Sequence, residues 1–146
     1  MDQKELIKNF YLFTDVTSND LQALEAIVER KVYIAGDHIY SEGEVADALF
    51  LVEMGTVDIV GKGKEIVFAT IGSAHGFGEL AFFERGTRPA SASARERTHI
   101  LRMPYERLSN VLSERPGLAL IVYRNACSFF AKHFRALALD LDRRYL

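Results

Sequence analysis

Residues 75–92 read HGFGELAFFERGTRPASA and combine the features of an anion-binding segment. Gly76 and Gly78 permit close backbone approach and positive φ just before a short apolar run, which predicts a helical turn over 79–83. The free N–H groups at the start of such a turn favour negative charge. Arg88 lies far enough along the segment to return across the turn, and its guanidinium can hold two phosphate oxygens. We therefore expect a phosphate group to bind here.

Glu79 is the unexpected member of this segment, because a carboxylate and a phosphate repel each other. The carboxylate is stabilised if it accepts a hydrogen bond, as acidic residues do from ribose hydroxyls in dinucleotide-binding folds. A phosphate next to a ribose hydroxyl indicates a nucleotide, whose base an apolar sheet could hold. A structural alternative stays open, in which Arg88 forms an ion pair with Glu79 or Glu84 when the site is empty.

Composition is typical of one ordinary domain. The chain has 146 residues, 49% of them hydrophobic and 26% charged, with a formal net charge of -2. This balance lacks the basic excess that nucleic-acid binding needs, so we expect no nucleic-acid partner within this chain. Cys127 is the single cysteine, which excludes an internal disulfide and suits a cytoplasmic location. The N-terminus lacks the apolar core of a signal peptide, and charges interrupt 118–141, so we expect no membrane partner.

Three regions follow one another along the chain: helices over 1–30, short strands over 31–103, and helices over 104–146. Thr17 and Asp20 form a capping signal in the first region. The middle region alternates β-rich runs with glycines, which predicts an antiparallel β-roll with a hairpin tip at 61–64. Its expected strands are 32–34, 38–40, 49–52, 57–60, 66–71, 91–96 and 98–103. No composition shift marks a boundary, so we predict a single α+β domain over 1–146.

A long C-terminal helix is predicted from about Pro116 to near the end of the chain. A heptad-like seam on it consists of Leu120, Tyr123, Cys127, Phe130, Phe134, Leu137 and Leu141. A second apolar line consists of Val122, Ala126, Phe129, His133 and Ala136. Either the helix covers the β-roll and also pairs with a second copy, or it lies wholly inside the domain. Exposed apolar stripes favour the first, a homodimer. Cys127 is expected to be a small buried side chain.

FGELAFFERGTRPASA and the upstream GDHIYSEGEVADALFLVEMGTV resemble the cyclic-nucleotide-binding domain family, as found in catabolite activator protein and in regulatory subunits of cAMP-dependent protein kinase. LFTDVTSNDLQAL and MPYERLSNVLSERPGLA also match its layout, so the resemblance covers nearly the whole chain. It implies a jelly-roll-like β-roll flanked by N-terminal helices and a long C-terminal helix. It places the phosphate-binding cassette at 76–92.

The resemblance also assigns roles to residues. In the family the carboxylate at Glu79 accepts from the ribose 2′-hydroxyl and the arginine at Arg88 pairs with the cyclic phosphate. The position after the arginine normally donates an N–H, but here it is Pro89, which has none. The Ala90 N–H, the Ser91 hydroxyl or a water could compensate. Guanine-selective members often carry threonine or serine there, so proline favours adenine. The expected cassette ligands are Gly78, Glu79, Leu80, Ala81, Arg88, Pro89, Ala90 and Ser91.

In this family the C-terminal helix closes over the base. By position, Phe129 and His133 are expected near the ligand, while Phe130 and Phe134 belong to the seam. The histidines show no metal-ligand spacing and no nucleophile is paired with a base, so we predict no metal, no catalytic residue and no enzyme. No cofactor is expected beyond the ligand, cAMP or else cGMP.

Three functional hypotheses follow. The leading one is a regulatory sensor in which binding of cAMP is coupled to movement of the C-terminal helix. The second is a degenerate cyclic-nucleotide-binding fold that acts as a dimerising interaction module without ligand. The third is the N-terminal part of a truncated transcription regulator, whose DNA-binding helices would follow this chain.

Overall fold

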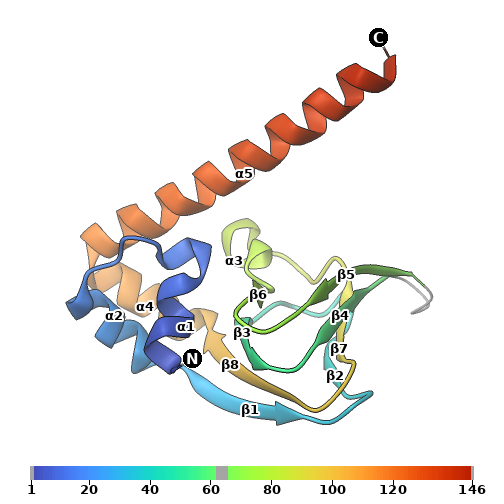
Figure 1. Ribbon diagram of the computed structural model, residues 1–146. Helices are drawn as coiled ribbons and strands as arrows, with labels where there is room; N and C mark the ends of the chain where they lie inside the picture. Colours follow the sequence, from blue (N-terminus) through green and yellow to red (C-terminus); the bar gives the residue numbers. More distant parts are fainter. Residues whose placement is uncertain (1, 62–65, 146) are drawn as a thin grey trace.

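The computed structural model describes residues 2–61 and 66–145, with side chains as far as residue 141. Most of the predicted hairpin tip at 61–64 therefore lies outside the described residues. Helices from both ends of the chain gather beside a set of short strands (Figure 1). The helices are α1 (Gln3–Asn9), the 3-10 helix η1 (Tyr11–Phe13), α2 (Ser18–Glu25), α3 (Leu80–Glu84), α4 (Tyr105–Glu114) and α5 (Pro116–Tyr145).

The described strands form two four-stranded sheets, in which every neighbouring pair is antiparallel. The first sheet has the order β1-β8-β3-β6 and the second the order β2-β7-β4-β5. The strands are β1 (Glu29–Tyr33), β2 (His38–Tyr40), β3 (Ala48–Met54), β4 (Val57–Val60), β5 (Val67–Ile71), β6 (Gly76–Phe77), β7 (Ser91–Ala94) and β8 (Thr98–Pro104). The predicted α+β class, an antiparallel β-roll flanked by helices, is confirmed.

Strand β3 explains why the helices and the roll form one unit. Its five residues Ala48–Val52 are at most 3% exposed. Side chains on a strand point alternately to opposite faces. Ala48, Phe50 and Val52 belong to the apolar cluster between the two sheets, whereas Leu49 and Leu51 belong to the cluster shared with the helices. A strand covered on both sides is apolar throughout, as the sequence ALFLV is.

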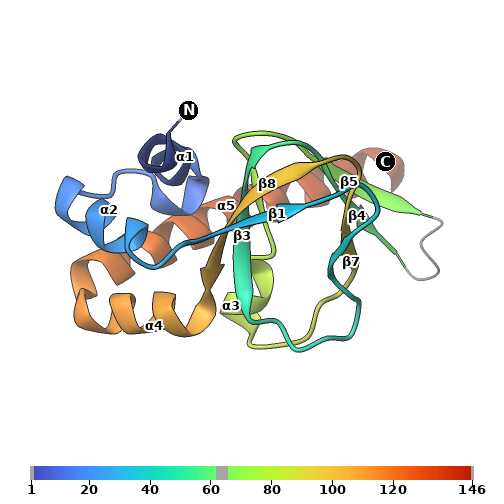
Figure 2. The ribbon, with the colours of Figure 1, turned by 90° about the horizontal axis from the view of Figure 1, so that it is seen from below.

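Helices α1, α2 and α4 and the start of α5 pack together on one side of the roll (Figure 2). Leu101 and Met103 of β8 join the two leucines of β3 in the core that the helices cover. From the helices, this core receives Leu6, Ile7, Leu12, Phe13, Leu21, Leu24, Leu108, Leu112, Leu118, Val122 and Ala126. The N-terminal helices and the start of α5 are therefore seated on the back of the first sheet, next to the cassette.

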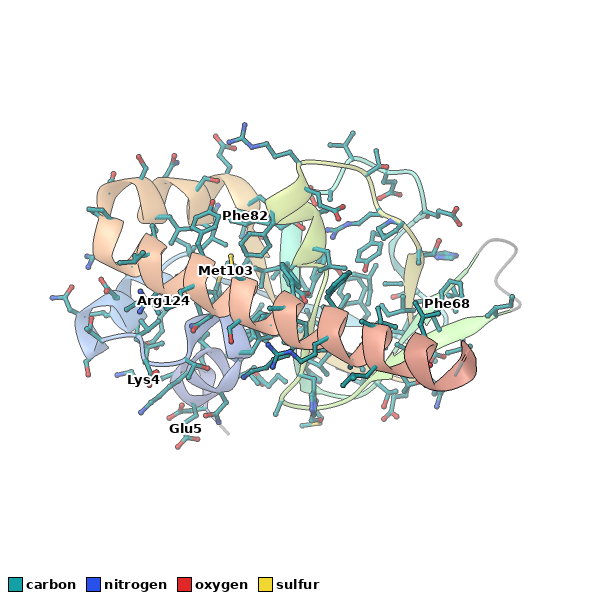
Figure 3. All side chains as sticks on the ribbon, turned by 90° about the horizontal axis from the view of Figure 1, so that it is seen from above. Lys4, Glu5, Phe68, Phe82, Met103 and Arg124 are labelled. Carbon is teal, nitrogen blue, oxygen red and sulfur yellow. The ribbon has the colours of Figure 1, made fainter. Side chains whose placement is uncertain are left out.

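Helix α5 is buried only along its first part. Val122 and Ala126 are buried, whereas every side chain from 131 to 141 is exposed. Seen from above, α5 runs across the roll (Figure 3), but the side view shows its C-terminal half rising away from the sheets (Figure 1). The alternative of a helix wholly inside the domain is therefore wrong. Within the described residues, no helix has the length and hydropathy needed to span a membrane.

The prediction that Cys127 is buried is also wrong, because its thiol side chain is exposed. On a helix with 3.6 residues per turn, adjacent positions point about 100° apart. Ala126 faces the core, so Cys127 faces away from it. The line Leu118, Val122 and Ala126 contacts the domain, and most of the predicted seam remains on the surface.

Candidate functional site

A cavity of about 220 Å³ opens between the second sheet, α3 and the segment after it. We call it the cassette cavity. The predicted ligand-binding residues that line it are Gly78, Glu79, Leu80, Ala81, Arg88, Pro89 and Ala90. The remaining wall consists of Tyr40, Ile59, Ile71, Gly76 and Phe77. The structure thus brings most of the predicted residues to one hollow, and the inner apolar face of the roll supplies the rest of its lining.

Gly78 sets the shape of the cassette. Its φ is +80°, a value that residues with a side chain rarely adopt. A Cβ atom there would lie 3.0 Å from Arg88 Nη1 and 3.2 Å from the Phe50 ring. Helix α3 begins after Glu79, one residue later than predicted, and ends at Glu84; the next residue, Arg85, lies in the left-handed region. Glycine therefore lets the chain turn closely around the buried arginine.

Arg88 is 3% exposed and is held by backbone carbonyls and aromatic rings. Its Nη2 donates to Ala48 O at 2.6 Å, and its Nη1 donates to Gly78 O at 2.9 Å and to Tyr105 Oη at 3.3 Å. The guanidinium carbon lies 4.1 Å from the centre of the Tyr40 ring, which is a cation–π contact. Carbonyl dipoles and a π-face stabilise the cation without neutralising it. The cavity wall therefore keeps a positive charge.

Glu79 is the second buried charged group of the cavity, with 9% of its surface exposed. Its Oε1 accepts a hydrogen bond from the hydroxyl of Tyr11, at 3.0 Å. Burial raises the pKa of Glu79, while its hydrogen bonds and the charge of Arg88 act in the opposite direction. Among the described residues, Arg88 forms no ion pair with Glu79 or Glu84, so the structural ion-pair alternative is not what this structure contains.

A larger side cavity, of about 530 Å³, adjoins the cassette cavity. The two share Ile71, Gly76 and Glu79 as a common wall. Phe129 of α5 and Tyr11 line the side cavity, and their rings stack with centroids 4.0 Å apart. Of the residues predicted near the base, Phe129 therefore lies beside the cassette cavity rather than within it.

His133 and Ser91 line neither cavity. The His133 ring is exposed and lies 4.1 Å from the ring of Phe129. The Ser91 hydroxyl accepts a hydrogen bond from the Glu42 N–H at 2.8 Å. Ser91 is therefore already engaged in holding the loop before β3, and Ala90 is the neighbour of Pro89 that lines the cassette cavity.

Three tyrosines of the site were missed by sequence reasoning: Tyr11, Tyr40 and Tyr105. They come from η1, β2 and α4, and each contacts Arg88 or Glu79 directly. Burial raises the pKa of Tyr40 to about 12 although Arg88 lowers it, so this phenol stays neutral at physiological pH. No local spacing could have identified them, since the fold alone brings these distant segments to the cassette.

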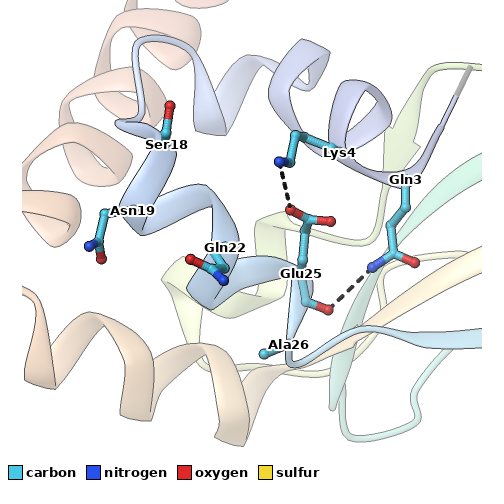
Figure 4. A pocket seen from close by; sticks show the side chains of 7 residues that line it. All are labelled: Gln3, Lys4, Ser18, Asn19, Gln22, Glu25 and Ala26. Carbon is cyan, nitrogen blue, oxygen red and sulfur yellow. Dashed lines mark hydrogen bonds and ion pairs between the residues drawn. The ribbon is translucent and has the colours of Figure 1, made fainter.

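A hollow of about 800 Å³ between α1 and α2 is a weaker candidate (Figure 4). Lys4 Nζ lies 3.9 Å from Glu25 Oε1, and Gln3 Nε2 donates to Glu25 O at 3.2 Å. All its lining side chains are exposed or half-buried, so it holds no desolvated charge. Across the part of the chain that the structure describes, no group of three or more His, Cys, Asp or Glu side chains could hold a metal ion.

Comparison with known proteins agrees with this geometry. The family model described as Cyclic nucleotide-binding domain matches residues 30–115, which is more than half of the chain. The chain is 28% identical over 139 residues to the Cyclic AMP receptor protein of Thermus thermophilus, covering 93% of this chain and 62% of that protein. It is 26% identical over 113 residues to a mouse hyperpolarization-activated cyclic nucleotide-gated channel, covering 77% of this chain and 13% of the channel.

Solved structures show the same fold. The Thermus thermophilus Catabolite Activator Protein superposes with a TM-score of 0.74 at 29% identity, covering 90% of this chain and 62% of that one. The N-terminal domain of a transcriptional regulator from Streptomyces coelicolor gives 0.79 at 24% identity, with 88% and 94% covered. The regulatory domain of Toxoplasma gondii PKA, crystallised with cAMP, gives 0.70 at 19% identity, with 76% and 46% covered. The predicted family is thereby confirmed, and the chain belongs to the cyclic nucleotide-binding domain family.

Proposed function

We propose that this chain is a non-catalytic regulatory module that binds a cyclic nucleotide in the cassette cavity. The observation that carries the proposal is the pair of buried charged groups in one wall, Arg88 and Glu79, with few other polar groups around them. Arg88 supplies a fixed cation for the cyclic phosphate. Glu79 supplies an acceptor for the ribose 2′-hydroxyl, which is the role that the family assigns to this position.

The proposed ligand is cAMP in preference to cGMP. Pro89 stands where guanine-selective relatives often place a hydroxyl residue, so the cassette lacks that hydroxyl. Two similar proteins point the same way, since one is named for cyclic AMP and another was crystallised with cAMP. Ile59 and Ile71 line the cavity with apolar surface on which an adenine ring could pack.

Binding is proposed to move α5. The cassette cavity, at about 220 Å³, is smaller than the 300–1,000 Å³ that is usual for ligand sites. A nucleotide must therefore enlarge it, and the neighbouring space is bounded by Phe129 of α5. A ligand that binds the enlarged arrangement more tightly shifts the population of α5 positions.

The first test is direct binding of cAMP, measured by isothermal titration calorimetry and by thermal melting. We expect saturable binding of one cAMP per chain and a melting temperature that rises with ligand concentration. At 100 times Kd, the ligand adds about 2.7 kcal/mol to the free energy of unfolding. The absence of any heat or melting shift with millimolar cAMP and cGMP would overturn the proposed function.

We also propose that two copies pair through α5. Phe134 and Leu137 are 74% and 65% exposed, and Leu120 and Leu141 of the same seam are exposed as well. A continuous apolar stripe of this kind usually marks an interface. Light scattering is expected to give the mass of a dimer, and Phe134→Glu with Leu137→Glu the mass of a monomer. Lys132→Glu, on the opposite face, is the control that should remain dimeric. A monomeric wild type would contradict the pairing.

A further inference from the structure

Tyr11 joins three parts of the molecule that the proposed ligand must rearrange. It belongs to η1, and its hydroxyl donates to Glu79 Oε1 of the cassette at 3.0 Å. Its ring stacks on Phe129 of α5, with centroids 4.0 Å apart and planes 17° apart. One side chain thus contacts both the proposed ribose acceptor and the helix proposed to move.

We propose that Tyr11 is an internal competitor for the ribose hydroxyl: in the free protein it occupies the Glu79 carboxylate, and a bound cyclic nucleotide displaces it. This inference rests on the proposed function and names a residue that tunes it. A carboxylate this deeply buried needs a donor in every state, because an unpartnered buried acceptor is costly. The phenol supplies that donor in the free state and the ribose hydroxyl supplies it in the bound state.

The position of Glu79 places the two donors on opposite sides of its carboxylate. Glu79 lies in the wall between the cavities, and its carboxylate reaches toward Tyr11 on the side-cavity face. The proposed phosphate partner, Arg88, lines only the cassette cavity. A nucleotide anchored on Arg88 approaches from the opposite face of that wall. In the proposed exchange, the carboxylate turns away from Tyr11 to accept from the ribose.

Arg88 also forms hydrogen bonds with groups of the protein itself. Three of its five N–H groups donate to the carbonyls of Ala48 and Gly78 and to the hydroxyl of Tyr105, which itself donates to Gly78 O. Both charged groups of the cavity therefore have partners within the protein. In the proposed exchange, the Tyr11–Glu79 bond is replaced by a ligand bond, so the affinity depends on how strongly Tyr11 competes.

Displacement of Tyr11 also reaches α5 by two routes. Its ring stacks on Phe129, and the neighbouring backbone is hydrogen-bonded to the same helix. Asn125 Nδ2 of α5 donates to Leu12 O at 2.9 Å and to Thr14 O at 3.0 Å. A change in the Tyr11 side chain therefore occurs where α5 contacts η1. In the proposal, the ribose hydroxyl is thus the ligand group whose binding is coupled to the position of α5.

Tyr11→Phe tests the competition, because it removes the hydroxyl and keeps the ring on Phe129. We expect the Kd for cAMP to fall by about 10-fold, the loss of one competing hydrogen bond to a charged group. Tyr33→Phe is the matched control, since this half-buried tyrosine lines neither cavity and its hydroxyl bonds to no described residue. It should leave the Kd unchanged. Circular dichroism melting establishes that both variants fold.

The probe 2′-deoxy-cAMP separates competition by Tyr11 from a general loosening of the site, which would change the binding of both nucleotides equally. This nucleotide lacks the hydroxyl that displaces Tyr11. Tyr11→Phe should therefore lower the Kd for cAMP by about 10-fold and leave the Kd for 2′-deoxy-cAMP almost unchanged. In the wild type the two ligands should differ little, because one hydrogen bond to Glu79 is exchanged for another. An equal gain for both ligands, or weaker cAMP binding by Tyr11→Phe, would overturn the competition alone.

Binding that is absent from the wild type but present in Tyr11→Phe would support both proposals. If neither protein binds cAMP or cGMP at millimolar concentration, the proposed function fails, and the competition fails with it. Each result therefore assigns failure either to the site as a whole or to the role of this tyrosine.

Discussion

Replacement of Arg88 by alanine is expected to raise the Kd for cAMP by at least 100-fold. The substitution removes the fixed cation from the cassette cavity, and with it the charge-assisted hydrogen bonds to the phosphate. Each such bond contributes about 1.5–3 kcal/mol, so the loss of two exceeds a factor of 100. Isothermal titration calorimetry at fixed ionic strength measures the effect.

Arg88→Ala should also destabilise the empty protein. The carbonyl of Ala48 loses its buried donor, at a cost of about 1–3 kcal/mol, whereas Gly78 O keeps the hydrogen bond from the Tyr105 hydroxyl. Urea denaturation without ligand measures this change in the free energy of unfolding. The binding loss is then judged on the folded fraction, so that the two roles of the arginine are separated.

Two further variants make the Arg88 result specific. Arg85→Ala removes an arginine three residues away, which lies in the left-handed region. Because Arg85 is exposed, the Kd for cAMP should change by less than 2-fold. Arg88→Lys keeps the charge but lacks the planar fork, and intermediate binding is expected. If Arg88→Ala binds cAMP like the wild type, the phosphate is held elsewhere and the assignment of the cassette cavity is wrong.

The local structure of the cassette could be predicted from the sequence because its features lie within one segment. Gly78 and Arg88 lie within one short segment, and the structural requirement for each, a positive φ and a buried fork, is met by few residue types. Strands bounded by glycines were likewise placed within a few residues of their observed ends. Where the structural requirement and the residue that meets it lie in one segment, the sequence pattern predicts the structure.

Prediction failed where distant segments decide the outcome. The periodicity of α5 defines two apolar lines, but it does not say which one faces the domain. Leu118 and Val122 meet the core because the N-terminal helices lie there, and Cys127 is left outside. Tyr11 and Tyr105 reach the site for the same reason, through the packing of η1 and α4 against the roll. Such contacts depend on tertiary arrangement and leave no spacing signal.

Pro89→Ser is expected to lower the Kd for cAMP by about 10-fold or more. Pro89 lines the cassette cavity directly after Arg88, the proposed phosphate-binding arginine, and as a proline it presents no N–H there. Serine restores a backbone donor, which can form a charge-assisted hydrogen bond to the phosphate worth about 1.5–3 kcal/mol. Ser91, whose hydroxyl accepts from the Glu42 N–H, does not line the cavity, so it provides no such contact in this arrangement.

Pro89→Ala separates the effect of the backbone N–H of serine from that of its hydroxyl, since alanine supplies the N–H without the hydroxyl. We expect alanine to recover most of the gain for cAMP, and serine to add more for cGMP than for cAMP. Both variants lose the proline constraint on the unfolded chain, which should lower the free energy of unfolding by about 0.4–1 kcal/mol. Affinity and stability therefore move in opposite directions, which a general stabilisation of the fold cannot produce. Equal Kd values for proline, alanine and serine would mean that the phosphate makes no contact at this position, and that Arg88 alone holds it.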